Sequence, residues 1–393
     1  MNGEKFKLKD HITWLLSLSI GVSVLSQIEP LAIVMKPLMH LLWLLSLFAL
    51  IASDVKNIRL SPFTKVFLCT YGLYLLYCGI LTAFGQSYLN GNFLRVLPVP
   101  LLVSIIADLC SDKLDKKSIE RLMMSYVLFS LLYGIYIHVS FFPSYTEWLK
   151  CMSYAYDSKN TATQIWAVAG VLLLLGVEYR NVFQKVIGCL LSGYLLFICC
   201  LTQGRTVLLA IACAYLAFVL LNAKKKLRWI ICSIIAACLL WAFIPTRRFI
   251  LHTFLVDLYS SNQMGTGLEL NAFSSGRLGH YKDALLCISQ SPVIGTGKYY
   301  VDNLYIAILA ESGIIGLLLI LPVLVLRALQ NLFVKAGKRD RALLLVLTTF
   351  YAVESVLEGY PPLGPGVCSM MFWFVSIYIC NHGEIPKQLQ LKW

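Results

Sequence analysis

Long apolar runs, separated by short polar segments, dominate the chain from end to end. A membrane-spanning helix needs about 20 mostly apolar residues, and many runs approach that length. The pattern therefore predicts an all-α, polytopic integral membrane protein with about 12 transmembrane helices. The predicted spans lie near residues 11–28, 33–53, 64–84, 93–110, 119–142, 162–178, 183–202, 206–222, 228–245, 304–326, 341–360 and 363–381.

The composition supports this prediction and limits what else the chain contains. Of its 393 residues, 59% are hydrophobic and only 13% are charged, whereas soluble domains carry about 25% charged residues. A long soluble domain has no room, so we expect one transmembrane domain over residues 1–393.

The net charge of +13 comes from 33 basic residues, most of them in alternate short segments such as Lys113–Arg121 and Lys224–Arg228. Cytoplasmic loops of membrane proteins are enriched in Lys and Arg. This distribution predicts that both termini are cytoplasmic, and it explains the charge without nucleic acid. The Lys-rich start is followed by an apolar run without a small-residue cleavage site, which predicts a retained first span.

Two of the predicted outer segments are long, near residues 141–163 and 246–303. Long connections of this kind are often functional. The second, between spans 9 and 10, contains its own helical pattern, with Leu278, Tyr281, Leu285 and Ile288 three or four residues apart. We expect a short amphipathic helix there, capped by Ser274 or Ser275 and ended by Pro292 and the glycines of 295–297.

The basic residues of the outer segments are the first candidates for chemistry. Arg205 and Arg277 each follow a glycine, and Arg95, Lys159 and Asn160 stand at the outer starts of spans. A guanidinium binds phosphate oxygens bidentately, so converging arginines favour a phosphate-bearing ligand. A single arginine more often anchors a helix at the lipid interface, but two Gly-Arg pairs favour ligand binding.

Acidic residues also gather in the predicted outer half. Asp302 and Asn303 precede the tenth span, Glu311 lies about 13 Å further along that helix, and Glu354 lies near the outer end of the next span. For Glu311 and Glu354, a salt bridge and direct ligand contact are equally plausible interpretations, because carboxylates within membranes usually pair or function. His280 lies one turn after Arg277 and is a weaker ligand candidate.

Cofactor chemistry has little support in the sequence. The thirteen cysteines form no metal-ligand spacing, and most lie in apolar runs, where they act as small hydrophobic residues. We expect no metal or other cofactor. Whether Cys151 and Cys287 pair is left open by the sequence.

Several stretches occur together in an order that resembles a known family. They are Leu201–Thr206 (LTQGRT), Ser275–Arg277 (SGR), Ser291–Gly297 (SPVIGTG), Asp302–Ile306 (DNLYI) and Glu311–Gly316 (ESGIIG). Over about residues 155–375 the chain resembles the O-antigen ligase and polysaccharide polymerase family. Ser158–Asn160, Glu354 and Phe372–Trp373 look more like the polymerase branch.

The resemblance implies a metal-independent, inverting glycosyltransferase at the outer face of the bacterial inner membrane. Its donor would be a glycan on undecaprenyl diphosphate and its acceptor a second lipid-linked molecule, with membrane lipids, a chain-length regulator and a flippase as further partners. Arg205 and Arg277 match the family's two arginines. Asp302 replaces a histidine of the ligases, and an aspartate can still deprotonate an acceptor hydroxyl. We assign Arg205, Arg277 and Asp302 to catalysis, and the remaining candidates to substrate binding: Arg95, Lys159, Asn160, His280, Asn303 and Glu311.

Three functions are compared. The first is a polymerase of O-antigen, capsule or exopolysaccharide repeat units, and the second is a ligase that transfers the glycan to lipid A–core. The third is a polysaccharide or small-molecule transporter, which is expected to show matched broken helices and midplane charges. Because the ionisable residues gather toward one face, the pattern favours the enzymes.

Overall fold

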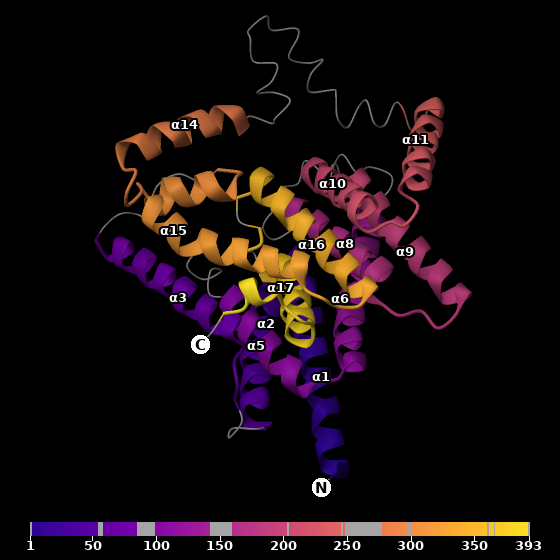
Figure 1. Cartoon of the computed structure of the whole chain (residues 1–393), viewed down its shortest axis with the longest axis horizontal. Helices are drawn as coiled ribbons and strands as arrows, with labels where there is room; N and C mark the ends of the chain where they lie inside the picture. Colours follow the sequence, from indigo (N-terminus) through magenta and orange to yellow (C-terminus); the bar gives the residue numbers. More distant parts are fainter. Residues whose placement is uncertain are drawn as a thin grey trace, which may run out of the picture.

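A computed structural model describes residues 2–53, 58–84, 99–141, 159–202, 204–244, 247, 277–297, 301–359, 361–364 and 366–391. Within these ranges the fold is helical, apart from a single β-bridge between Lys335 and Glu384. The helices, labelled as in Figure 1, are α1 (Asn2–Leu25), α2 (Glu29–Ser53), α3 (Pro62–Ala83), α5 (Val99–Lys113), α6 (Lys116–Phe141), α8 (Lys159–Val171) with the π-helical turn η2 (Leu172–Gly176), α9 (Val182–Leu201), α10 (Arg205–Leu221), α11 (Lys226–Ala242), α14 (Arg277–Gln290), α15 (Leu304–Phe333), α16 (Lys338–Leu357), α17 (Gly366–His382) and the short 3₁₀ turn η4 (Lys387–Leu389).

The surface of this bundle is apolar over long stretches. Among the described residues, five helices are long and apolar enough to cross a membrane, namely α2, α3, α6, α9 and α15. Large side chains such as Ile33 (85% exposed) and Leu190 (68% exposed) point outward from them. Apolar surface of this extent needs a bilayer to cover it, so the molecule is a membrane protein. Each of the twelve predicted ranges contains a helix, whereas the number of crossings stays a prediction.

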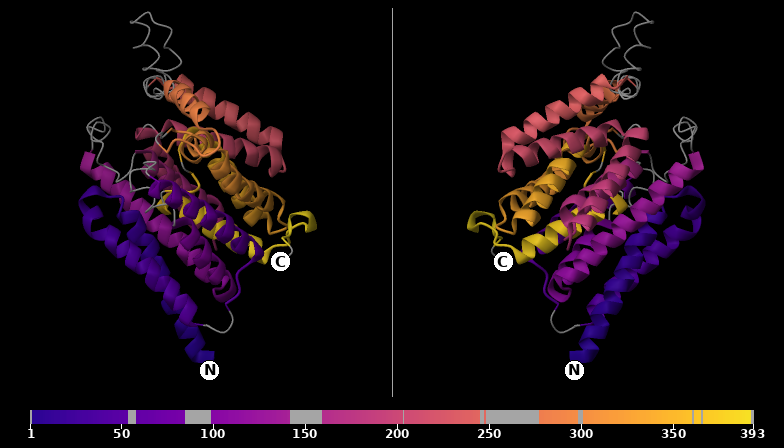
Figure 2. Two further views of the ribbon diagram at one scale, coloured as in Figure 1. Left: turned by 90° about the vertical axis from the view of Figure 1, so that its left-hand side faces the viewer. Right: turned by 90° about the vertical axis from the view of Figure 1, so that its right-hand side faces the viewer.

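The bundle is held together by pairs of helices, some of them distant in sequence. α1 packs on α2 and α6, and α8 packs on α9, whereas α5 meets α17 and α10 meets α16 across the chain. Aromatic residues fill the core between helices: Trp166 and Trp373 are fully buried, and Trp373 of α17 stacks on Phe67 of α3 with ring centroids 4.7 Å apart. In Figure 2 the N-terminus and α14 lie at opposite ends of the bundle.

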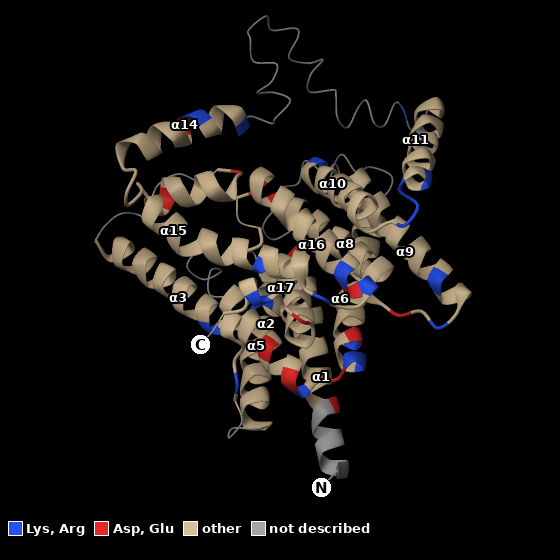
Figure 3. Cartoon of the chain, viewed as in Figure 1, with Lys and Arg blue, Asp and Glu red and all other residues tan. Residues whose placement is uncertain are grey.

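Charged side chains gather at helix ends, and the helices between are largely uncharged (Figure 3). At one end, Glu178 bonds to Lys116 and lies 3.7 Å from Arg339, and Arg121 lies 3.2 Å from Asp10. These five residues come from segments that the sequence predicted on one side of the membrane. The contacts between them agree with that common side.

Helix α15 is not the continuous tenth span that the sequence predicted. At Gly313 the backbone has φ 65° and ψ −167°, and the helix divides there into two arms that run in different directions (Figure 1). The segment that follows α14 fits into the break, where Ile314 N–H donates to Pro292 O and Gly297 N–H donates to Glu311 O. A Cβ on Gly313 would lie 2.2 Å from Val293 O, so a glycine is required.

Helix α14 begins and ends close to the predicted positions, but only part of its predicted apolar face is buried. The predicted apolar face included Leu278 and Leu285, and these are 45% and 57% exposed. Tyr281 and Ile288 of the predicted face are half-buried, as is Arg277, and Ala284 is fully buried. The prediction was wrong for the two leucines because the face that packs on α15 includes polar groups, which a hydrophobic pattern does not register. Ser274 and Ser275, the predicted caps, lie outside the described residues.

Candidate functional site

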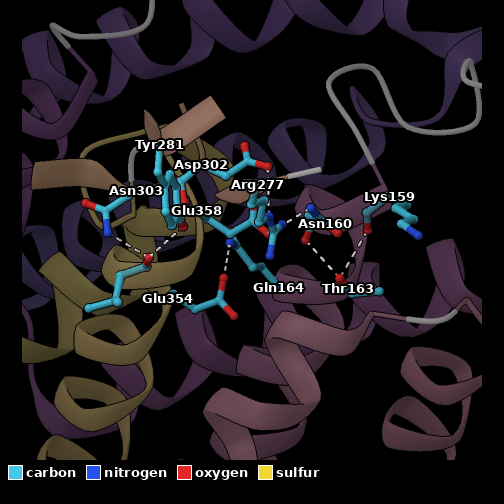
Figure 4. A network of polar contacts seen from close by, with 11 residues as sticks. Lys159, Asn160, Thr163, Gln164, Arg277, Tyr281, Asp302, Asn303, Glu354 and Glu358 are labelled. Carbon is cyan, nitrogen blue, oxygen red and sulfur yellow. Dashed lines mark hydrogen bonds and ion pairs between the residues drawn. The ribbon is translucent and has the colours of Figure 1, made fainter. Parts of the chain in front are cut away.

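Arg277, the first residue of α14, holds two carboxylates from different elements. Its Nε donates to Asp302 Oδ2 at 3.0 Å, and its Nη2 donates to Glu358 Oε1 at 2.7 Å (Figure 4). The side chains are 17%, 32% and 10% exposed for Arg277, Asp302 and Glu358. Partial burial strengthens such charge-assisted hydrogen bonds. Arg277 therefore ties the start of α14 to the start of α15, through Asp302, and to the end of α16, through Glu358.

Two hydrogen bonds connect α8 to α16 in register. Asn160 Nδ2 donates to Glu358 Oε1 at 2.9 Å, and Gln164 Nε2 donates to Glu354 Oε2 at 2.6 Å. Residues four apart lie on one helix face, so the pairs form successive rungs between antiparallel helices. Glu354 is fully buried and Gln164 is 4% exposed. Asn160 therefore links the first turn of α8 to the carboxylate that also holds Arg277.

The start of α15 presents Asp302 to this cluster. The Asn303 side chain accepts hydrogen bonds from the N–H groups of Tyr305 and Ile306, each at 3.0 Å, and donates to Val356 O at 2.9 Å. It is thus the N-cap of α15 and also ties that helix to α16. Tyr281 OH donates to Asp302 O at 2.8 Å. These bonds fix the backbone on both sides of the Asp302 carboxylate.

Arg205 enters the same region as the first residue of α10, a helix that packs along α16. The hydroxyl of the next residue, Thr206, faces the Glu358 carboxylate. Gly204 allows this approach, because a Cβ there would lie 2.7 Å from Cγ2 of Thr163 on α8. Gly204 therefore allows the start of α10 to pack closely on α8.

The electrostatics of the cluster keep Arg277 charged. Burial alone would lower the pKa of its guanidinium, but the carboxylates of Glu358 and Asp302 raise it above the ordinary value. Burial raises the pKa of the Tyr281 hydroxyl, which therefore stays a donor at neutral pH. The site thus combines a permanent cation with two carboxylates, a set that can bind a phosphate and accept a proton.

The structure places the remaining candidates outside this network. Lys159 begins α8, but its side chain points away from Arg277 in Figure 4. His280 is exposed on α14, where Tyr281 takes the place beside Asp302. Glu311 is fully buried on the first arm of α15, facing Tyr74 and Cys78 of α3. Arg95 lies outside the described residues.

The sequence did not point to Glu358 or Gln164 as site residues, and it indicated Tyr281 only as part of the apolar face of the loop helix. A usable signal was present, because Asn160 with Gln164, Glu354 with Glu358, and Arg277 with Tyr281 are each four residues apart. Such spacing marks one face of a helix. What the sequence did not contain is the pairing of those faces. Cys287 carries a free thiol, and Cys151 lies outside the described residues.

A bundle of apolar helices with a charged cluster at one end defines a membrane protein with a polar site on one face. Residues 190–321, which contain Arg205, Arg277 and Asp302, match the model of a family described as O-antigen ligase. This match covers less than half of the chain. It supports a relationship to the O-antigen ligases and polymerases, and it does not separate these two branches. No match to this sequence is found among curated proteins.

Proposed function

We propose that this protein is a membrane glycosyltransferase that polymerises oligosaccharide repeat units carried on undecaprenyl diphosphate, at the outer face of the bacterial inner membrane. The observation that carries the proposal is the Arg277 bridge to Asp302 and Glu358, with Arg205 beginning the neighbouring helix. It places permanent positive charge beside an accessible carboxylate. Those are the two groups that glycosyl transfer from a diphosphate requires.

The proposed step is a single displacement. A hydroxyl of the acceptor sugar attacks the anomeric carbon of the donor, and the bond from that carbon to the diphosphate oxygen breaks. The electron pair leaves with undecaprenyl diphosphate, and the hydroxyl proton moves to a carboxylate of the protein. One displacement inverts the anomeric configuration. Arg277 and Arg205 stabilise the negative charge that grows on the leaving group, so the step needs no metal ion.

Asp302 is the proposed base, and Glu358 is the proposed positioning residue. The Asp302 side chain is 32% exposed, whereas the Glu358 side chain is 10% exposed and accepts bonds from both Arg277 and Asn160. A base must reach a hydroxyl on a bound substrate. The more accessible carboxylate therefore takes the proton, and the buried one holds the arginine.

Contacts between the two stretches that resemble the polymerase branch favour the polymerase. The Ser158–Asn160 and Glu354 regions resemble the polymerase branch, and the structure joins these regions through Asn160 with Glu358 and Gln164 with Glu354. The alternative is a ligase that transfers the finished glycan to lipid A–core, and the description of the matched family favours it. A chain-length regulator and a flippase are proposed partners in either case.

The two enzymes differ in what accumulates when the protein is lost. If it is the polymerase, a deletion strain will carry core with one repeat unit, and expression of the intact chain will restore long glycan. If it is the ligase, long glycan will accumulate on undecaprenyl diphosphate. Gel analysis of lipopolysaccharide together with the extracted lipid carrier separates these outcomes, and a normal profile for both would contradict the proposal.

A further inference from the structure

A second arginine lies inside the bundle, away from the Arg277 cluster. Arg327 is in the second arm of α15, about 20 Å along that arm from Gly313 at 1.5 Å per residue, and is 1% exposed. Its Nε, Nη1 and Nη2 bond to no oxygen acceptor within the described part of the chain, and the thiol of Cys380 supplies a weak side-chain hydrogen bond. Because a guanidinium stays protonated in proteins, this is a buried charge with unused donors.

The neighbours of Arg327 compensate its charge only in part. The Phe63 ring covers one face, with its centroid 3.5 Å from Arg327 Cζ. The Cys380 thiol and the Asp108 carboxylate also face it. Asp108 is already engaged, since its Oδ2 accepts from Ser61 N–H at 2.6 Å and its Oδ1 from Asn381 Nδ2 at 2.5 Å.

A cavity of about 220 Å³ lies beside Arg327 and is also lined by Ser61, Phe63, Gln330, Asn381 and Gln390. Its volume is several times the roughly 30 Å³ share of one water molecule. Ser61 is the N-cap of α3, so the N-terminus of that helix adds positive potential at the cavity wall. Gln330 Nε2 donates to Leu389 O at 3.1 Å, which holds the C-terminal segment against the cavity.

We propose that this cavity binds a phosphate-class oxyanion. The planar guanidinium fork of Arg327 matches phosphate oxygens, and the cavity beside it is large enough to hold them. The source is either the headgroup of an anionic phospholipid in the leaflet at this end of the bundle or a soluble phosphate compound. This cavity is separate from the proposed site of glycosyl transfer. Asp302 precedes the first arm of α15 and bonds to Arg277, whereas Arg327 lies in the second arm.

The test uses the full chain in phosphatidylcholine nanodiscs, with either phosphatidylglycerol added to the lipid or inorganic pyrophosphate added to the buffer. We expect one probe to raise the Tm of the wild-type protein by a few degrees. Arg327→Met should lose that shift, whereas Lys335→Ala, an exposed cation near the end of the same helix, should keep it. A shift with phosphatidylglycerol alone identifies a lipid, and a shift with pyrophosphate alone identifies a soluble ligand.

The proposal is wrong if neither probe shifts the wild-type Tm, or if Arg327→Met responds as the wild type does. If Arg327→Met does not fold, Cys380 provides a measurement on the wild-type protein, because its thiol lies beside Arg327. The effective probe should slow alkylation of Cys380 by N-ethylmaleimide several-fold and leave exposed Cys189 unchanged. An unaltered rate at Cys380 would then overturn the proposal.

Discussion

Two of the five N–H donors of Arg277 are used in the described bonds to Asp302 and Glu358. This arrangement gives one residue two tasks, since the same fork positions two carboxylates and presents further donors to a phosphate. A lysine would supply the charge without the fork, so the geometry requires arginine at this position.

We expect Arg277→Ala to lower the rate of glycan transfer by at least about 10²-fold, the usual cost of removing one preplaced donor to developing charge. Arg277→Lys should recover only part of that loss, because an ammonium cannot bridge the two carboxylates. The measurement is product formation by purified protein at matched protein levels. Lys282→Ala, an exposed cation on the same helix, is the control, and full activity of Arg277→Ala would remove the diphosphate role.

The two carboxylates should respond differently to neutral substitution. Asp302→Asn should lower kcat by about 10²- to 10⁴-fold, since it removes the proposed proton acceptor. Glu358→Gln should cost less, because the amide oxygen still accepts from Arg277. Steady-state kinetics of both variants decide the assignment: wild-type rates for Asp302→Asn exclude it as the base, and a larger loss for Glu358→Gln exchanges the roles.

At the scale of elements, the site depends on how helix ends meet. The start of α8 pairs with the end of α16, and the start of α14 bonds to Asp302 just before α15. The start of α10 lies beside Glu358 at the end of α16. The break in α15 lets its first arm turn back, and the segment after α14 fills that break. The polar site is thus built on helix termini that packing elsewhere in the bundle holds in place.

A double-mutant cycle can measure the coupling free energy between Gln164 and Glu354. Gln164→Leu and Glu354→Leu should each destabilise the protein by about 1 to 3 kcal/mol, because each leaves a buried polar partner without its hydrogen bond. The double variant should cost less than the two losses added together. Chemical denaturation in detergent provides the free energies of unfolding, and strict additivity would show that the rung contributes no coupling.

Gly313 should tolerate no side chain. Gly313→Ala places a Cβ against Val293 O at a positive φ, so we expect a loss of about 2 to 4 kcal/mol. Gly193→Ala in α9 is the matched control, because nothing lies within 4 Å of its added Cβ, and alanine favours a helix by up to about 1 kcal/mol. Thermal unfolding in detergent compares them, and an equal Tm for both variants would contradict the strained break.

At the scale of the whole molecule, two polar ends are separated by an apolar middle. The contacts of Glu178 with Lys116 and Arg339 join segments predicted inside, and the Arg277 network joins segments predicted outside. Segments predicted on opposite sides do not meet in these clusters. The alternation of basic loops along the chain therefore agrees with the contacts of the folded bundle.

Reporter fusions test the predicted sidedness directly. Alkaline phosphatase fused after Lys225 should be inactive, and the same reporter fused after Lys282 should be active, because the intervening span carries the second junction outward. Green fluorescent protein at the same two junctions should give the opposite pattern. An active phosphatase after Lys225 would reverse the orientation and move the Arg277 cluster to the cytoplasm.

The sequence by itself determined the membrane class, the helix ranges and the residue types of the site. Apolar runs near span length and basic loops are local properties, and they need no knowledge of which helices touch. The Gly-Arg pairs and the Asp302–Asn303 start of a span likewise selected Arg277, Asp302 and Arg205 as candidates before any contact was known.

Only the tertiary structure decided which of these groups meet. Glu358 lies at the centre of the cluster because α16 packs against α8 and α10. Glu311 lies apart from the cluster and faces Tyr74 of α3. Tyr281, and not His280, lies beside Asp302, because Tyr281 is on the face of α14 that packs on α15. These outcomes depend on pairing between distant helices, and the free energy of such pairing is not encoded in any local pattern of residues.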